Sequence, residues 1–146
     1  MKTVVDANEI FACIISTGKY GTRSKVLKIL FSDKFEFFAP FRLLAEIENN
    51  RGEIKKKSDF STEGFDSFLE AIKLRIKFIP LEEFVDKISE SMDICPDIKD
   101  MEYFALSLRL HCCIWSEERS LKKQNKVEVF TTDELYDTIQ NLTPVF

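Results

Sequence analysis

Glycine and proline are scarce in this chain, and histidine is almost absent. Four glycines, four prolines and one histidine occur among the 146 residues, while charged residues make up 32% of the total. Few helix breakers and many charges predict well-formed helices with solvated outer faces. Hydrophobic residues make up 45% of the chain and include 14 phenylalanines. This apolar content suits one globular domain, which we expect to span residues 1–146.

The spacing of the cysteines excludes the usual pattern of a zinc site. Cys13, Cys95, Cys112 and Cys113 contain no C-x-x-C pair, and His111 is the lone histidine. A structural zinc site needs four such ligands at characteristic spacings. We therefore interpret the four cysteines as reduced packing residues of an intracellular protein, and His111 as a structural residue.

Long apolar runs and a strong positive charge are also missing. The early apolar run from Ile10 to Ile15 is too short to span a bilayer. Asp6 interrupts the start of the chain too soon for the apolar core of a signal peptide. We therefore expect a cytoplasmic protein without a membrane partner. The net charge of -4, from 21 basic and 25 acidic residues, argues against a wholly basic surface for nucleic acid, but it allows an acidic site.

Short apolar runs and helical patterns alternate along the whole chain. The runs predict strands over residues 3–5, 36–39, 75–79, 112–115 and 127–130. The helical patterns cover 9–17, 24–32, 41–57, 61–73, 82–91, 99–110, 116–124 and 133–139. This alternation is typical of an α/β fold, here with a five-stranded parallel sheet.

Acidic residues follow several of the predicted strands. In open parallel sheets, sites form beyond the carboxyl ends of the strands. A set of carboxylates without histidine or cysteine suits Mg²⁺ or Mn²⁺, which would polarise a phosphoryl oxygen and activate bound water. The candidates are Asp6 after the first strand, Glu46 on the helix after the second, Asp97 and Asp100 before the fourth, and Glu117 and Glu118 after the fourth.

Each acid also has an ordinary structural interpretation. Asp6 would serve as the N-cap of a helix that starts near Asn8. Asp97 and Asp100 would complement the positive end of a helix dipole. Their joint placement at one edge of the sheet is harder to explain in this way, and it favours a metal site.

Four segments together resemble the PIN-domain superfamily. They are VVDANEIFACII, FFAPFRLLAEIENNRGEIKKKSDFSTEGF, CPDIKDMEYFALSLRLHCCIWSEERSLKKQ and KVEVFTTDEL, and they follow in the family's order along almost the whole chain. The resemblance implies a three-layer α/β/α sandwich and ribonuclease activity that depends on Mg²⁺ or Mn²⁺. Because some members are toxins, it also implies RNA as substrate, an antitoxin protein as a potential partner, and a homodimer.

The resemblance also assigns roles to individual residues. Asp6, Glu46 and Asp100 match the first three acids of the family, and Asp97 resembles an extra carboxylate of some members. Asn8 and Ser116 match supporting polar positions that orient ligands or water. The fourth acid is usually Asp or Asn, whereas here Glu118 matches it with Glu117 beside it. This departure leaves open whether one or two metal ions bind.

Basic residues must contact the substrate, and several of them are candidates for this role. They are Lys19 and Arg23 after the first helix, and Arg119 and Lys122 after the fourth strand. A non-catalytic PIN-like module that binds RNA or protein is the alternative function. A phosphatase-like or response-regulator-like domain ranks last, because no lysine is suitably placed after the later strands.

Overall fold

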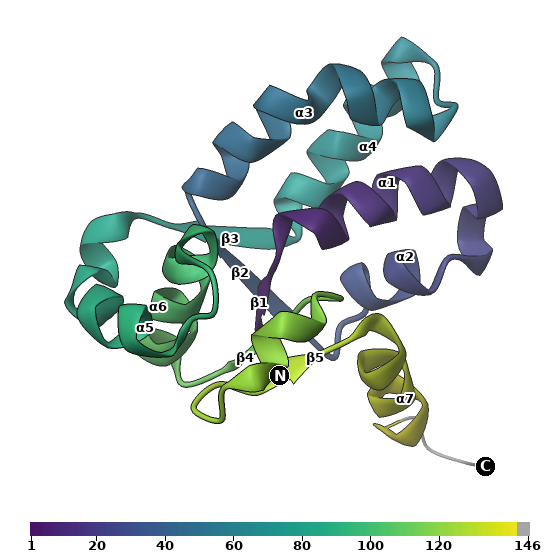
Figure 1. The fold of residues 1–146 in the computed structure, drawn as a ribbon. Coiled ribbons are helices and arrows are strands. Elements are labelled where there is room, and N and C mark those ends of the chain that lie inside the picture. The colour runs from purple at the N-terminus through teal and green to yellow at the C-terminus, as the bar shows by residue number, and fades with distance from the viewer. Residues whose placement is uncertain (143–146) are drawn as a thin grey trace.

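Five parallel strands form one sheet at the centre of the molecule (Figure 1). The computed structural model describes residues 1–142. The strands are β1 (Lys2–Val5), β2 (Glu36–Pro40), β3 (Ile76–Ile79), β4 (Cys113–Trp115) and β5 (Val129–Phe130), in the order β3-β2-β1-β4-β5. In the centre, Thr3 of β1 pairs with Phe37 on one side and Cys113 on the other. The predicted five-stranded parallel sheet is confirmed, and its carboxyl ends lie at one edge.

Helices cover both faces of this sheet, which gives the expected three layers (Figure 1). Successive strand residues point to opposite faces. Val5 therefore belongs to one hydrophobic core, and Val4 to the other. On the Val5 face pack α1 (Ala7–Tyr20), α2 (Lys25–Leu30), α3 (Arg42–Ser58), α4 (Thr62–Leu74) and α7 (Thr132–Leu142). On the Val4 face pack α5 (Ile88–Ile94) and α6 (Met101–Leu110).

Helix α1 leaves the end of β1 and packs tightly against α3. Its buried residues Ile10, Cys13 and Ile14 have the spacing of a single helix face. Gly18 on the same helix faces the end of α3, where a Cβ would lie 1.7 Å from the carbonyl oxygen of Ser58. A side chain at this position is therefore incompatible with the observed packing of the two helices.

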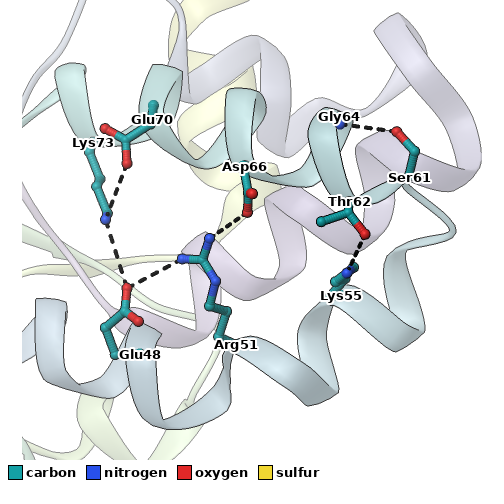
Figure 2. A network of polar contacts seen from close by, with 9 residues as sticks. All are labelled: Glu48, Arg51, Lys55, Ser61, Thr62, Gly64, Asp66, Glu70 and Lys73. Atoms are coloured by element: carbon teal, nitrogen blue, oxygen red, sulfur yellow. Dashed lines mark hydrogen bonds and ion pairs between the residues drawn. The ribbon is translucent and has the colours of Figure 1, made fainter.

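A network of charged side chains joins α3 to α4 on the molecular surface (Figure 2). Arg51 pairs with Asp66 across the two helices and with Glu48 at 3.3 Å on its own helix. Lys73 of α4 lies 4.0 Å from the same Glu48 carboxylate. Exposed ion pairs contribute little on their own. The guanidinium of Arg51 also lies 5.4 Å from the ring centre of buried Phe65, so the network covers the apolar contact between the helices.

Two predicted helices are only partly helical. Residues 82–91 form the 3₁₀ turns η2 (Leu81–Glu83) and η3 (Val85–Lys87) before α5 begins, because Phe84 between the two turns is buried in the core with a non-helical φ of -134°. Residues 116–124 contain only the 3₁₀ helix η5 (Arg119–Lys123), because the preceding backbone bonds to side chains instead. Two further 3₁₀ turns, η1 (Gly21–Arg23) and η4 (Ile98–Asp100), flank α1 and α6.

His111 and the buried cysteines have structural positions. His111 ends α6 in the left-handed conformation, with φ 52°, where glycine is common. The four cysteines are free thiols, and Cys13 and Cys113 are buried, as a packing role predicts. Burial raises the pKa of the Cys13 thiol to about 12. Within residues 1–142, none of the helices has the length and apolar character needed to cross a membrane.

Candidate active site

A polar cavity of about 290 Å³ lies beyond the carboxyl end of β1, where α1, α3 and α6 begin or pass. It contains five of the six predicted acids, which come from four separate segments of the chain. Two basic residues and a tyrosine also line it. The lining residues are Asp6, Asn8, Arg42, Glu46, Asp97, Lys99, Asp100, Tyr103 and Glu118.

Asp6 is the most rigidly held of these acids. It is the N-cap of α1, and its Oδ1 accepts a hydrogen bond from the backbone N–H of Asn8 at 3.4 Å. Its Oδ2 accepts from the hydroxyl of Ser116 at 2.8 Å. The residue is only 8% exposed, and this burial raises the pKa of its carboxyl, while the Ser116 hydrogen bond opposes the rise. Asp6 therefore caps a helix and also faces the cavity.

Glu46 is held by an aromatic hydroxyl and by a basic side chain. The hydroxyl of Tyr103 donates to Glu46 Oε1 at 3.1 Å, and Arg42 Nε lies 3.2 Å from the same oxygen. Arg42 also reaches Glu102 with Nη1 at 3.5 Å. Burial raises the pKa of the Glu46 carboxyl, and the contacts to Tyr103 and Arg42 act against it. Glu46 thus has an internal cation as its partner in the described structure.

Asp100 and Glu118 complete the acidic lining. Asp100 precedes α6 directly, and its pKa is raised to about 6, first by burial and then by the charges of Glu118, Asp6 and Asp97. Glu118 accepts a hydrogen bond at Oε1 from the hydroxyl of Ser120 at 3.0 Å. The contributions of neighbouring acids to the pKa of Asp100 indicate that negative charges repel one another in the cavity, and a bound cation would relieve this repulsion.

The donor set of the cavity fits a hard divalent cation. Within residues 1–142, no group of three acids, cysteines or histidines is already arranged to hold a metal ion. Mg²⁺ keeps several waters and needs only one or two direct carboxylates, so an arrangement of this kind is compatible with it. All five acidic side chains offer oxygen, which Mg²⁺ and Mn²⁺ prefer.

Several predicted residues lie outside this cavity. Lys19 lies in the last turn of the 14-residue helix α1, about 20 Å from Asp6 at about 1.5 Å per residue, and Arg23 lies in the 3₁₀ turn η1 beyond it. The structure therefore does not bring these two residues to the acids, and their role in binding the substrate stays a prediction. Lys122 pairs with Glu134 on α7. Arg119 is exposed and directly follows the cavity residue Glu118.

Arg42, Lys99 and Tyr103 are cavity residues that the sequence analysis missed. Two of them carry a signal in their spacing. Arg42 precedes Glu46 by four residues on α3, and Tyr103 follows Asp100 by three, so each shares a helix face with a predicted acid. Lys99 had no comparable signal, since a lysine between two acids is ordinarily a solvated residue.

A second polar network lies outside the cavity lining and includes the predicted residue Glu117. Glu9 on α1 is 1% exposed. Its Oε1 accepts from the backbone N–H of Glu117 at 2.9 Å, and its Oε2 accepts from the hydroxyl of Thr132 at 3.2 Å. The Glu117 carboxylate accepts from the backbone N–H of Thr132 at 2.5 Å, away from the cavity lining. Burial, followed by the charge of Glu117, raises the pKa of Glu9 to about 7.

The fold agrees with the comparison with known families. Residues 4–140 match a family model described as PIN domain, and the chain belongs to this family. Among solved structures, the present chain is similar to one chain in the crystal structure of VapBC2 from Rickettsia felis. In that structure VapBC2 is bound to a DNA fragment from its own promoter. The identity is 13% and the TM-score 0.60, over 90% of this chain and 98% of that chain, so the likeness concerns the fold. No curated protein matches this chain.

Proposed function

We propose that this PIN-domain protein is a metal-dependent endoribonuclease that hydrolyses phosphodiester bonds of RNA in the acidic cavity. The observation that carries the proposal is the convergence of Asp6, Glu46, Asp100 and Glu118 in one cavity. Membership of the PIN-domain family supports it, because the resemblance to this family implies ribonuclease activity that depends on Mg²⁺ or Mn²⁺.

The residues that would hold Mg²⁺ or Mn²⁺ are the acids of the cavity. Asp6 and Asp100 are our candidates for the strongest ligands, since one is fixed by two hydrogen bonds and the other has a pKa raised by burial and by its acidic neighbours. Glu46, Asp97 and Glu118 would add charge or hold metal-bound water. When bound, the ion would supply electrophilic assistance at a phosphoryl oxygen and a more acidic water.

The other lining residues would orient the substrate and the acids. Ser116 and Asn8 fix the two oxygens of Asp6. Arg42 and Lys99 are the basic side chains that line the cavity. They are candidates for contacting an RNA phosphate, and Arg119 lies close by in the chain.

An antitoxin protein and a second copy of the chain stay predictions. The similarity to a VapBC2 chain supports a search for a partner protein. Co-expression with the product of a neighbouring gene, followed by gel filtration, would test this part of the proposal separately from the nuclease activity.

Cleavage of an unstructured RNA with Mg²⁺ or Mn²⁺ tests the nuclease proposal. Asp6→Asn keeps the shape of the side chain and removes its charge, so cleavage should fall by orders of magnitude. Glu118→Gln should reduce activity less, because this position departs from the family pattern. Asp33→Asn is the matched control, since Asp33 is exposed and precedes β2 at the opposite edge of the sheet.

Two outcomes would contradict the proposal in different ways. A wild-type protein that is inactive with every metal and a range of RNAs would favour the non-catalytic binding module. A wild type that cuts RNA, with Asp6→Asn cutting equally well, would keep the activity and refute the assignment of the site.

A further inference from the structure

Glu9 is a buried carboxylate that the proposed reaction does not use. It does not line the cavity, and within the described part of the chain it forms no ion pair. Its hydrogen bonds come from the N–H of Glu117 and the hydroxyl of Thr132. Burying a carboxylate without a cation is unfavourable, so these hydrogen bonds offset a considerable desolvation cost.

The segment Ser116–Glu118 leads from β4 to the last acid of the cavity, and the start of α1 holds it at two points. The hydroxyl of Ser116 donates to Asp6 Oδ2 at 2.8 Å, and it accepts from the N–H of Glu118 at 3.1 Å. One helical turn further along α1, Glu9 accepts from the N–H of Glu117 at 2.9 Å. The N–H groups of Glu117 and Glu118 are therefore both tied to the start of α1, that of Glu118 through the hydroxyl of Ser116.

We propose that Glu9 is a positioning residue of this site: its carboxylate holds the backbone of Glu117 and so keeps Glu118 in the acidic cavity. This inference rests on the proposed function. It adds a residue that acts through the segment carrying the fourth acid and makes no contact with substrate or metal.

Electrostatic repulsion explains why the segment needs such an anchor. The charges of Glu118 and Asp6 both raise the pKa of Asp100, so Glu118 sits among like charges that favour its withdrawal toward solvent. Glu118 is itself exposed, and its side chain is bonded only to nearby Ser120 in the described structure. The backbone hydrogen bonds are therefore the contacts that resist this withdrawal.

The N-terminus of α7 fixes Glu9 from the other side. The Thr132 hydroxyl that donates to Glu9 also accepts from Trp115 Nε1 at 3.1 Å, and Trp115 is fully buried. The two carboxylate oxygens of Glu9 thus have separate hydrogen-bond partners. One holds the segment that carries Glu118, and the other is held by Thr132, which gives a way to test them independently.

Hydrogen exchange and Mn²⁺ titration of four variants test the inference. Glu9→Ala removes the acceptor for the Glu117 N–H. Glu9→Asp keeps the charge, but its side chain is shorter by one methylene, so the accepting oxygen no longer reaches this N–H. In both, the amide of Glu117 should exchange at least about tenfold faster, and Mn²⁺ affinity measured by calorimetry should fall about tenfold, as for other groups that orient metal ligands. Glu9→Gln still offers an oxygen to this N–H and should rescue both properties.

Thr132→Val is the matched control on the other oxygen of Glu9. It should lower thermal stability while the Glu117 amide stays protected, because the contact between Glu9 and Glu117 is kept. An unprotected Glu117 amide in the wild type, or equal exchange in wild type and Glu9→Ala, would overturn the inference. Equal Mn²⁺ affinity in these two proteins would overturn it as well. A wild type that binds no Mn²⁺ would contradict the proposed function, and the exchange data would still decide whether Glu9 holds the segment.

Discussion

The metal-free protein should become more stable as the pH falls from about 7 toward 4.5, and Glu9 should account for much of this gain. Burial raises the pKa of Glu9 from 4.5 to about 7 in the folded protein. Between these two values the folded state binds a proton that the unfolded state releases. The free energy of unfolding therefore decreases as the pH rises through this interval, and it is level above and below it.

The magnitude follows from the width of the interval. Each pH unit corresponds to about 1.4 kcal/mol, so the interval from 4.5 to about 7 gives about 3 kcal/mol. Solvent screening leaves this value largely intact, because Glu9 is 1% exposed. For a protein of this length, about 3 kcal/mol corresponds to a change in Tm of roughly 6–12 °C.

Urea unfolding between pH 4.5 and 8, with a chelator present, measures this dependence. Asp6, Glu46 and Asp100 also have raised pKa values and contribute in the same direction. Comparison with Glu9→Gln cancels their contribution. The variant should be about 3 kcal/mol more stable than the wild type at pH 8, and the two should converge near pH 4.5. Parallel curves for the two proteins would refute the reasoning, because Glu9 would then not be desolvated on folding.

The further predictions concern packing and the cavity. Gly18→Ala should destabilise the protein by about 3 kcal/mol or more, because its Cβ would lie 1.7 Å from a carbonyl oxygen of α3. Gly52→Ala, in open space on the same pair of helices, should stabilise it by up to about 1 kcal/mol, and equal thermal melts would contradict the packing argument. Mn²⁺ should raise the Tm more at pH 7.5 than at pH 5, because protons compete with the metal ion for Asp100, whose pKa is about 6. Equal Tm shifts at the two pH values in a fluorimetric melt would contradict this prediction. Arg42→Ala should bind Mn²⁺ more tightly in calorimetry, since the variant loses the cation that pairs with Glu46. The same variant should have a higher KM for RNA, because Arg42 is a candidate for contacting a phosphate. An unchanged KM would exclude a role of Arg42 in substrate binding.

The sheet and the acidic edge could be predicted from the sequence because local signals determine them. Apolar runs of strand length alternate with helical patterns, and Asp6 follows the first of them directly. Parallel strands place their carboxyl ends at a common edge, so acids after different strands converge without any knowledge of the helix packing. For the same reason, five acids of the cavity were found before the structure.

The features that were missed depend on contacts between distant residues. The segment after β4 has a helical pattern in the sequence. In the structure it is not helical, because Asp6 and Glu9, which lie more than 100 positions earlier in the chain, form hydrogen bonds with it. Glu9 itself gave no signal, because an acid in the first turn of a helix is ordinarily explained by the helix dipole. The sequence indicates that Lys19 lies near the first helix, but only the described length of α1 shows how far it is from Asp6.

The order of the strands also bears on when the site forms during synthesis. The central strand β1 has β2 on one side and β4 on the other, and the hydrogen bond between Ser116 and Asp6 spans 110 positions. A nascent chain that has emerged only as far as α6 already carries Asp6, Glu46 and Asp100, but it lacks β4 and the segment with Glu118. Contacts of such long sequence separation form late in folding. The complete set of acids is therefore assembled only after most of the chain has left the ribosome.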